Sequence, residues 1–243
     1  MPRTQSKSKT RKKKISIRIP LGRIFFDLLL LFLAVTVIPV MLYGIIDPPT
    51  TPLMWIRWAE GGYQNDAPKK LASWVTLEEV SPHLIKAVIA SEDQRYFRHK
   101  GFDWYAIKLA FIQNFRNDKK IGASTISMQT ARNVFLWQDR TWLRKALEAY
   151  FTFLIEIFWN KKRILEVYLN VIEWGNGIYG CDLASRTYFN HSAKSTSPIE
   201  SAWMAAILPN PRAWSIHNPP QGVVERQAKI LDWMYQLRIP LRL

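Results

Sequence analysis

Nineteen consecutive residues without a charged side chain, Leu28 to Ile46, constrain this chain more than any other feature. As an α-helix rising about 1.5 Å per residue, they would span about 28 Å, close to the hydrocarbon core of a bilayer. Pro39 and Gly44 interrupt the run, but both residue types are tolerated in membrane helices. The run therefore predicts a transmembrane anchor over residues 28–46 and argues against a buried helix of a soluble protein.

The flanks of this run predict its orientation. Residues 1–27 hold nine Lys/Arg against one acid, Asp27. A cleaved signal peptide has the same order of basic and apolar segments, but Tyr43–Pro49 lacks an A-x-A-like cleavage site. By the positive-inside rule, residues 1–27 are a basic cytoplasmic tail. We therefore expect a single-pass protein of the plasma (inner) membrane, with everything after Asp47 on the periplasmic or extracytoplasmic side.

The remaining sequence predicts a linker and one folded domain. Residues 47–72 are expected to be a linker, because the prolines at 48, 49 and 52 block regular structure. Residues 73–243 are expected to form the functional domain. Of the net charge of +15, +7 lies outside the basic tail, which suits anionic lipids or phosphorylated substrates. Nucleic acid is excluded as a partner by the predicted outside location.

Helix-start signals recur along this domain, and no alternating strand pattern is evident, so a mainly α fold is expected. The expected N-caps are Ser81, Asp103, Thr141, Asn160 and Ser197. The chain has eleven tryptophans, and four of them, Trp55, Trp58, Trp137 and Trp142, could rest at a membrane interface. Core packing is the alternative for each of the four and is favoured most for Trp142. There is one cysteine and no Cys/His cluster, so no structural metal site is indicated.

Glu92 is the first candidate for chemistry. It lies four residues after Val88 and three after Ile89, so it shares the apolar face of the helix that begins near Pro82. Burial and a helix C-terminus both disfavour an ionised carboxylate, which suits a general base near neutral pH. The alternative is a surface glutamate paired with Arg95 or Arg98, and the spacing alone does not decide between them.

The segment 122–133 predicts a phosphate site. If Ser124 opens a helix, Thr125, Gln129 and Arg132 share one polar stripe, and Arg140 follows shortly. A helix N-terminus, hydroxyl groups and an arginine together can hold a phosphate. A capped surface helix is the alternative interpretation.

Two further segments contain recognisable patterns: a set of charged residues at 144–148 and a GxGxxG match at 175–180. Arg144 and Glu148 are i,i+4 neighbours beside Lys145, and an apolar run after Glu148 predicts that its carboxylate is partly buried. This set is either a structural ion pair or a device that places catalytic cations.

Gly175–Gly180 matches GxGxxG, but the preceding residues read as a helix and no βαβ unit is evident, so we interpret it as a glycine-rich turn.

Taken in order, these segments resemble glycosyltransferase family 51, the peptidoglycan glycosyltransferases, in their single-domain, monofunctional form. The resemblance covers roughly residues 70–238 and includes Lys162–Asn170 and Leu208–Pro211. Two positions depart from the family pattern. Met128 stands where the first of two adjacent glutamines is usual, and Arg132 stands where a lysine is usual, which keeps the charge but changes its geometry.

The resemblance implies a lysozyme-like helical domain with a small membrane-facing jaw. It implies that lipid II is polymerised into linear glycan strands, by inverting transfer of the lipid-diphosphate-linked chain to the GlcNAc 4-hydroxyl of lipid II. Glu92 would be the base, and Glu148 would orient cations and assist the leaving group. The diphosphate and sugar would be bound by Ser124, Thr125, Gln129, Arg132, Arg140 and Lys145. No cofactor is required by the sequence, although Mg²⁺ or Mn²⁺ could accompany the diphosphate.

The expected partners are lipid II, the growing lipid-linked glycan and the bilayer, and other cell-wall synthesis proteins could join them. Two alternatives stay open at this point. A lytic transglycosylase or muramidase of lysozyme-like fold would cut glycan instead of building it. A non-enzymatic, membrane-anchored cell-wall scaffold would use the same topology without chemistry.

Overall fold

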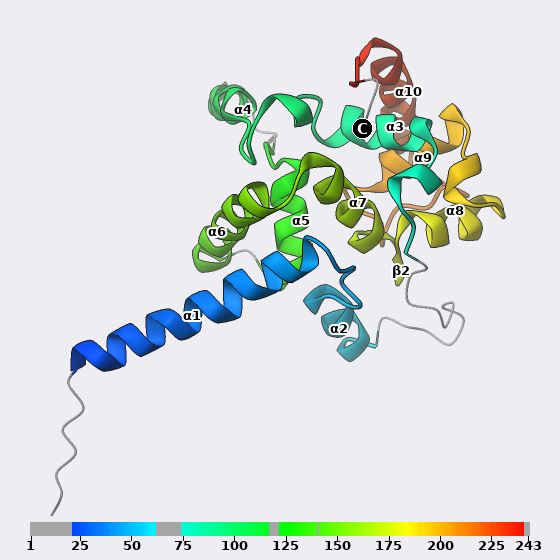
Figure 1. Cartoon of the computed structure of the whole chain (residues 1–243). Helices are drawn as coiled ribbons and strands as arrows, with labels where there is room; N and C mark the ends of the chain where they lie inside the picture. Colours follow the sequence, from blue (N-terminus) through cyan, green and yellow to red (C-terminus); the bar gives the residue numbers. More distant parts are fainter. Residues whose placement is uncertain (1–20, 62–73, 117–121, 140, 241–243) are drawn as a thin grey trace, which may run out of the picture. The chain divides into compact units, whose positions relative to one another are not determined.

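The computed structural model describes residues 21–61, 74–116, 122–139 and 141–240, and within these ranges the chain is mainly helical, as predicted (Figure 1). The α-helices are α1 Leu21–Tyr43, α2 Pro52–Ala59, α3 Pro82–Glu92, α4 Trp104–Arg116, α5 Ile126–Phe135, α6 Trp142–Phe158, α7 Lys161–Val171, α8 Cys181–Phe189, α9 Pro198–Ile207 and α10 Gln221–Gln236. Single turns of 3₁₀ helix cover Leu77–Glu79, Tyr96–Arg98 and Ala193–Ser195. The chain divides into two compact units, Met1–Ile38 and Pro39–Leu243.

Helix α1 contains most of the predicted anchor. Among the described residues it is the one helix long and apolar enough to cross a bilayer, with a mean hydropathy of 2.6. Its described part begins at Leu21, inside the predicted basic tail. It ends at Tyr43, and Gly44 to Ile46 form a turn in which the Gly44 amide donates to the Val40 carbonyl over 3.2 Å.

The last turn of α1 belongs to the second unit and is hydrogen-bonded within it. The Trp159 indole Nε1 donates to the Val40 carbonyl over 2.6 Å. The Arg163 guanidinium donates to the carbonyl oxygens of Tyr43 and Ile46 over 3.0 and 2.8 Å, and it pairs with Asp47 at 2.8 Å. Residues 39–47 are therefore part of the packed domain, and a truncation that respects the fold removes residues 1–38.

A chain lacking residues 1–46 should be less stable than one lacking residues 1–38. The shorter deletion keeps Val40, which is fully buried and occupies the acceptor position for Trp159. Losing that burial costs on the order of 2 kcal/mol, which corresponds to roughly 4–8 °C in melting temperature for a domain of this size. Thermal unfolding of the two truncated chains in the same detergent measures the difference. Equal melting temperatures would show that the contacts of residues 39–46 contribute nothing to stability.

The predicted linker contains a helix, which corrects the expectation that its prolines exclude regular structure. Thr51 caps α2, and Pro52 occupies its first turn, where proline has no hydrogen bond to lose. Leu53 and Met54 are buried in a small cluster with Tyr179. The Thr-Pro pair is thus a helix start, and tertiary contacts hold a helix that is too short to be stable alone.

Two groups of helices build the core. Helices α3, α9 and α10 pack against one another, and α5 packs against α6 and α7 (Figure 1). Predicted N-caps open several of these helices. Ser81, Thr141, Asn160 and Ser197 each accept a backbone N–H from the first turn of α3, α6, α7 or α9. Asp103 Oδ1 likewise accepts the amides of Tyr105 and Ala106 at the start of α4, both over 3.0 Å.

A short antiparallel hairpin is present where no strand was expected. Strand β1 is Glu173–Gly175 and pairs with β2, Ile178–Tyr179. Gly177 and Gly180 have φ values of +73° and +86°, a region that favours glycine. The GxGxxG segment is therefore a glycine-rich turn, as predicted, and its strands are too short to show an alternating pattern.

Large aromatic side chains are exposed on several helices, among them α4 and α6. On α4 these include Trp104, Phe111 and Phe115, which are 72%, 66% and 81% exposed. On α6, Trp142 is 91% exposed, which excludes the alternative of core packing for this side chain and agrees with an interfacial position. Trp142 is the first residue of α6, so no preceding turn of that helix covers it.

Candidate active site

Glu92 is the last residue of α3 and lies at the centre of a hydrogen-bond network between four helices. Gln129 Nε2, from α5, donates to Glu92 Oε2 over 3.0 Å, and Arg226 Nη2, from α10, donates to Oε1 over 3.1 Å. The Tyr168 hydroxyl, from α7, donates to Gln129 Oε1 over 3.1 Å. The Glu92 side chain is 13% exposed, so it is largely shielded yet reachable.

These partners exclude the alternative interpretation of Glu92 as a surface residue paired with Arg95 or Arg98. Arg95 lies 3.5 Å from Asp103 and stacks over the Tyr105 ring at 4.6 Å. Burial raises the pKa of Tyr168 well above its ordinary value, and the Glu92 carboxylate adds to the effect. Tyr168 therefore stays protonated and donates, which fixes the orientation of the Gln129 amide toward Glu92.

Asp93, the next residue, holds the end of α3 against the start of α5. Its buried carboxylate accepts the Ile126 amide over 3.0 Å and the His99 Nε2 over 2.9 Å. The Thr125 hydroxyl donates to the Gly101 carbonyl over 2.5 Å. These contacts place Gln129 opposite Glu92, because Gln129 lies one turn into α5.

A cavity of about 530 Å³ lies beside this network. Gln129 and Tyr168 line it, so the residue whose side-chain amide donates to Glu92 also lines the cavity. The cavity carries four guanidinium groups and two carboxylates. Its lining is Leu53, Arg57, Gln129, Arg132, Asn133, Gln138, Asp139, Arg144, Tyr168, Ile172, Glu173, Leu208, Pro209, Asn210, Pro211 and Arg212. An excess of cations in a partly closed space favours an anionic ligand.

Glu148 forms the predicted ion pairs beneath this cavity. Its side chain is 2% exposed and accepts Arg144 Nη1 and Lys145 Nζ, both over 2.5 Å. Arg144 lines the cavity, whereas Glu148 and Lys145 do not. The buried carboxylate therefore forms the structural ion pair and holds one of the cavity's cations in place.

The structure brings only some of the predicted phosphate-binding residues together. Gln129 and Arg132 face the cavity, but Ser124 and Thr125 do not line it. The helix is capped by Thr125 and not by Ser124, and the Thr125 hydroxyl is used by Gly101 and by the Met128 amide. Arg140 lies outside the described residues.

Met128 points into the core, where it is 6% exposed. The departure from the family pattern at this position thus places a thioether among apolar neighbours, and no polar group at position 128 contributes to the site.

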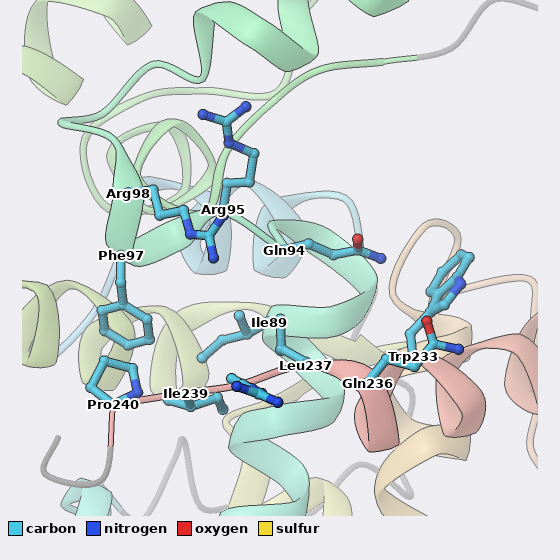
Figure 2. A pocket seen from close by; sticks show the side chains of 11 residues that line it. Ile89, Gln94, Arg95, Phe97, Arg98, Trp233, Gln236, Leu237, Ile239 and Pro240 are labelled. Carbon is cyan, nitrogen blue, oxygen red and sulfur yellow. The ribbon is translucent and has the colours of Figure 1, made fainter.

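A second hollow of about 660 Å³ lies between the ends of α3 and α10, away from the predicted residues (Figure 2). In the view of Figure 2, Phe97 and Pro240 lie on one side of Ile89, and Gln94 and Trp233 lie on the other. Neither Glu92 nor any predicted binding residue lines this hollow. It is therefore not the candidate active site.

Sequence reasoning missed several residues of the site. Tyr168 lies within a segment that contributed to the resemblance, but no role was attached to it. Arg226 lies 134 residues after its partner, and Arg57 lies in the predicted linker, so no local spacing signalled either. In the part of the chain that the structure describes, no group of three or more His, Cys, Asp or Glu could hold a metal ion.

Comparison with known proteins identifies clear relatives. A family model described as Transglycosylase matches residues 62–235. A protein of Bdellovibrio bacteriovorus named biosynthetic peptidoglycan transglycosylase is 50% identical over 193 residues, covering 79% of this chain and 77% of that protein. Proteins with the same name are 49% identical in Rhodospirillum centenum, covering 84% and 83% of the two chains, and 46% identical in Bacteroides thetaiotaomicron, covering 86% and 84%.

Proposed function

This chain belongs to the transglycosylase family and is a peptidoglycan glycosyltransferase, and we propose that it polymerises lipid II with Glu92 as the general base. The growing glycan on its lipid diphosphate is the donor, and the GlcNAc 4-hydroxyl of an incoming lipid II is the acceptor. Glu92 takes the proton of that hydroxyl as its oxygen attacks the anomeric carbon, and the diphosphate leaves from the opposite face with inversion.

The observation that carries this proposal is the position of Glu92 beside a cationic cavity. Gln129 and Arg226 each donate to one oxygen and so hold the carboxylate in a fixed orientation, and a base must be held within reach of the proton that it takes. The adjoining guanidinium groups suit a substrate whose leaving group is a diphosphate. A cutting enzyme of the same class has no diphosphate to bind, so the cavity favours synthesis over cleavage.

The diphosphate is proposed to lie against Arg132 and Gln129, with Arg140, Lys145, Ser124 and Thr125 as further ligands. Thr125 would act through its place at the helix N-terminus, since its hydroxyl is already used. Glu148 acts indirectly, because it holds Arg144 at the cavity. Fixed cations of this kind stabilise the negative charge that develops on the leaving group. A divalent cation, if it takes part, would draw ligands from the diphosphate itself.

The anchor is proposed to cross the plasma (inner) membrane with the N-terminus in the cytoplasm and the catalytic domain outside. Helix α1 supports the crossing, and the basic residues before it support the orientation. The exposed aromatics of α4 and α6 support a membrane-facing jaw. Such an arrangement holds the active site next to lipid-borne substrates and raises their effective concentration.

Removing residues 1–38 should therefore reduce the rate on membranes more than the rate in detergent. The truncated chain keeps Val40 and its partner Trp159, so its domain stays intact. In neutral detergent we expect a rate within about twofold of the full chain, and on lipid II in liposomes a loss of about tenfold or more. Polymerisation measured in both systems tests this. An equal loss of rate in detergent and in liposomes, or no loss in either, would show that the anchor only directs the protein to the membrane.

The proposed activity is tested by incubating the full chain with lipid II in detergent and resolving the products by size. Linear polymer supports the proposal. Release of soluble muropeptides from purified sacculi, with no polymer from lipid II, would instead favour a lytic enzyme. A chain that neither consumes lipid II nor cuts sacculi under any condition would support the scaffold alternative.

A further inference from the structure

Two tryptophans lie on the outer side of the short helix α2, a helix that precedes the matched family region at residue 62. Trp55 and Trp58 are 59% and 64% exposed, and their rings meet edge to face with 6.1 Å between centroids. Trp58 follows Trp55 by three residues, so the two side chains share one side of the helix. We call them the tryptophan pair. Clustered apolar side chains on a surface indicate a site of contact with another molecule.

The opposite side of α2 faces the domain. Leu53 and Met54 are buried in a cluster with Tyr179, and Leu53 and Arg57 line the active-site cavity. The tryptophan pair lies away from this packed side, as the exposure of both rings shows. Helix α2 therefore carries a wall of the cavity on one side and an aromatic surface on the other.

The charges of α2 are balanced. Arg57 is its one charged residue; it pairs with Glu60 at 2.7 Å and lies 3.5 Å from Glu173. Attraction of α2 to another molecule therefore has to come from the aromatic surface and not from a cation. A tryptophan ring is apolar but carries one N–H donor, and tryptophan is enriched where bilayer hydrocarbon meets water. The tryptophan pair thus fits a bilayer interface better than a soluble polyanion.

The chain connection keeps α2 close to the end of the anchor. Helix α1 ends at Tyr43, and Asp47 is held by its ion pair with Arg163 at 2.8 Å. Pro52 opens α2 five positions after Asp47, so the connection spans at most about 18 Å when fully extended. The 23 residues of α1 measure about 34 Å, slightly more than the hydrocarbon core, so the proposed crossing ends among the headgroups. Helix α2 is within reach of the same layer.

We propose that the tryptophan pair inserts into the outer interface of the bilayer and holds α2 there, as a membrane contact separate from the jaw. The inference rests on the proposed function, because it explains how the cavity is kept at the level of a lipid diphosphate. Since the other side of α2 supplies part of the cavity wall, fixing α2 at the interface fixes that wall near the headgroups. The exposed aromatics of α4 and α6 belong to other helices and form a different surface.

A nitroxide spin label at position 59 measures the insertion directly. Ala59 is exposed and follows Trp55 by four residues, so Ala59→Cys places the label on the same side of α2 and leaves the tryptophan pair intact. The one native cysteine, Cys181, is buried. Ala228→Cys, at an exposed position of α10, is the matched control, since α10 packs against α3 and α9 whereas α2 packs against α5. Each labelled full chain is reconstituted into vesicles of phosphatidylethanolamine and phosphatidylglycerol.

Relaxation of the label by oxygen and by a water-soluble nickel complex distinguishes bilayer, water and protein as its surroundings. The label at 59 should be more accessible to oxygen and less accessible to nickel than the label at 228, and replacing the tryptophan pair by alanine should remove the difference. Equal accessibility at the two positions would place α2 in water and overturn the inference. Low accessibility to both reagents would show a protein cover, and spin–spin broadening would identify a second copy of the chain; both results would also overturn it.

Replacing the tryptophan pair in the unlabelled full chain tests its effect on turnover. With Trp55→Ala and Trp58→Ala together, we expect a rate about tenfold lower on lipid II in liposomes and within about twofold of the wild type in neutral detergent. The loss should be the same at low and at high salt, because the charges of α2 are balanced. Tyr235→Ala is the control, since it removes an aromatic side chain that is 76% exposed on α10. It should keep both rates.

The two measurements separate this inference from the proposed function. Accessibility of the label needs no turnover, so insertion would stand even if the chain failed to polymerise lipid II. A chain that polymerised lipid II with its label in water would keep the proposed function and lose the inference. An unchanged rate in liposomes would refute the claim that insertion holds the cavity near the headgroups. Equal losses in liposomes and detergent, with a fall in melting temperature, would make the tryptophan pair a support of the fold and overturn the inference.

Discussion

Glu92→Gln should abolish glycan polymerisation, with a loss of about 10³-fold or more, while the domain stays folded. The amide has the size of the carboxyl group but cannot take the acceptor's proton. Gln129 and Arg226 would lose a negatively charged partner, yet the Arg226 side chain is 29% exposed and can turn to water. The cost in stability should therefore be small beside the cost in rate.

The measurement is lipid II turnover in detergent, together with thermal unfolding of both proteins. Glu225→Gln is the matched control, because Glu225 is an exposed acid one residue before Arg226 and, among the described residues, accepts one long hydrogen bond, from Gln221. That variant should polymerise at the wild-type rate. Near-normal synthesis by Glu92→Gln would require another base and would remove the central assignment.

Local signals in the sequence predicted the helices well because each has a local physical cause. The Thr141 side chain caps α6 whatever the rest of the chain does, and the Ser197–Glu200 capping box likewise closes within one turn. The same holds for Glu92, whose place on the apolar face of α3 follows from its spacing to Val88 and Ile89.

Local signals in the sequence failed to predict features that depend on tertiary contacts. Pro52 is a helix breaker by its residue type, but it occupies the first turn of α2, which is held by the packing of Leu53 and Met54 against Tyr179. For Trp142, core packing was the favoured alternative to an interfacial position, yet the side chain is exposed at the first position of α6. Burial of a single side chain depends on what packs against its helix, which the spacing does not contain.

The site shows the same division. Gln129 and Arg132 were recognised because they share a stripe on one helix, and both face the cavity. Arg226 and Arg57 reach the site only through the packing of α10 against α3 and of α2 against α5. Contacts between such distant segments are set by the whole core, so one sequence without its fold could not have placed them.

Arg132→Ala should lower kcat/KM by about 10²–10³-fold, a loss typical of removing one fixed charge that faces the leaving group. Arg132 follows Gln129 by three residues on α5 and lines the cavity. Its buried Nε has no hydrogen-bond partner within the described part of the chain. Among the described residues, no hydrogen bond or ion pair uses the Arg132 guanidinium to hold the fold, so the alanine variant should keep its melting temperature.

Arg132→Lys separates charge from geometry at this position. A lysine is usual here in glycosyltransferase family 51, so this variant should retain turnover within about tenfold of the wild type. Arg98→Ala is the matched loss of one cation, because Arg98 is exposed and lines the second hollow, away from Glu92. Turnover of lipid II by the three variants shows whether the position of the Arg132 charge matters or only the overall charge. If Arg98→Ala and Arg132→Ala lost activity equally, the effect would be one of overall charge, and Arg132 would have no specific place at the diphosphate.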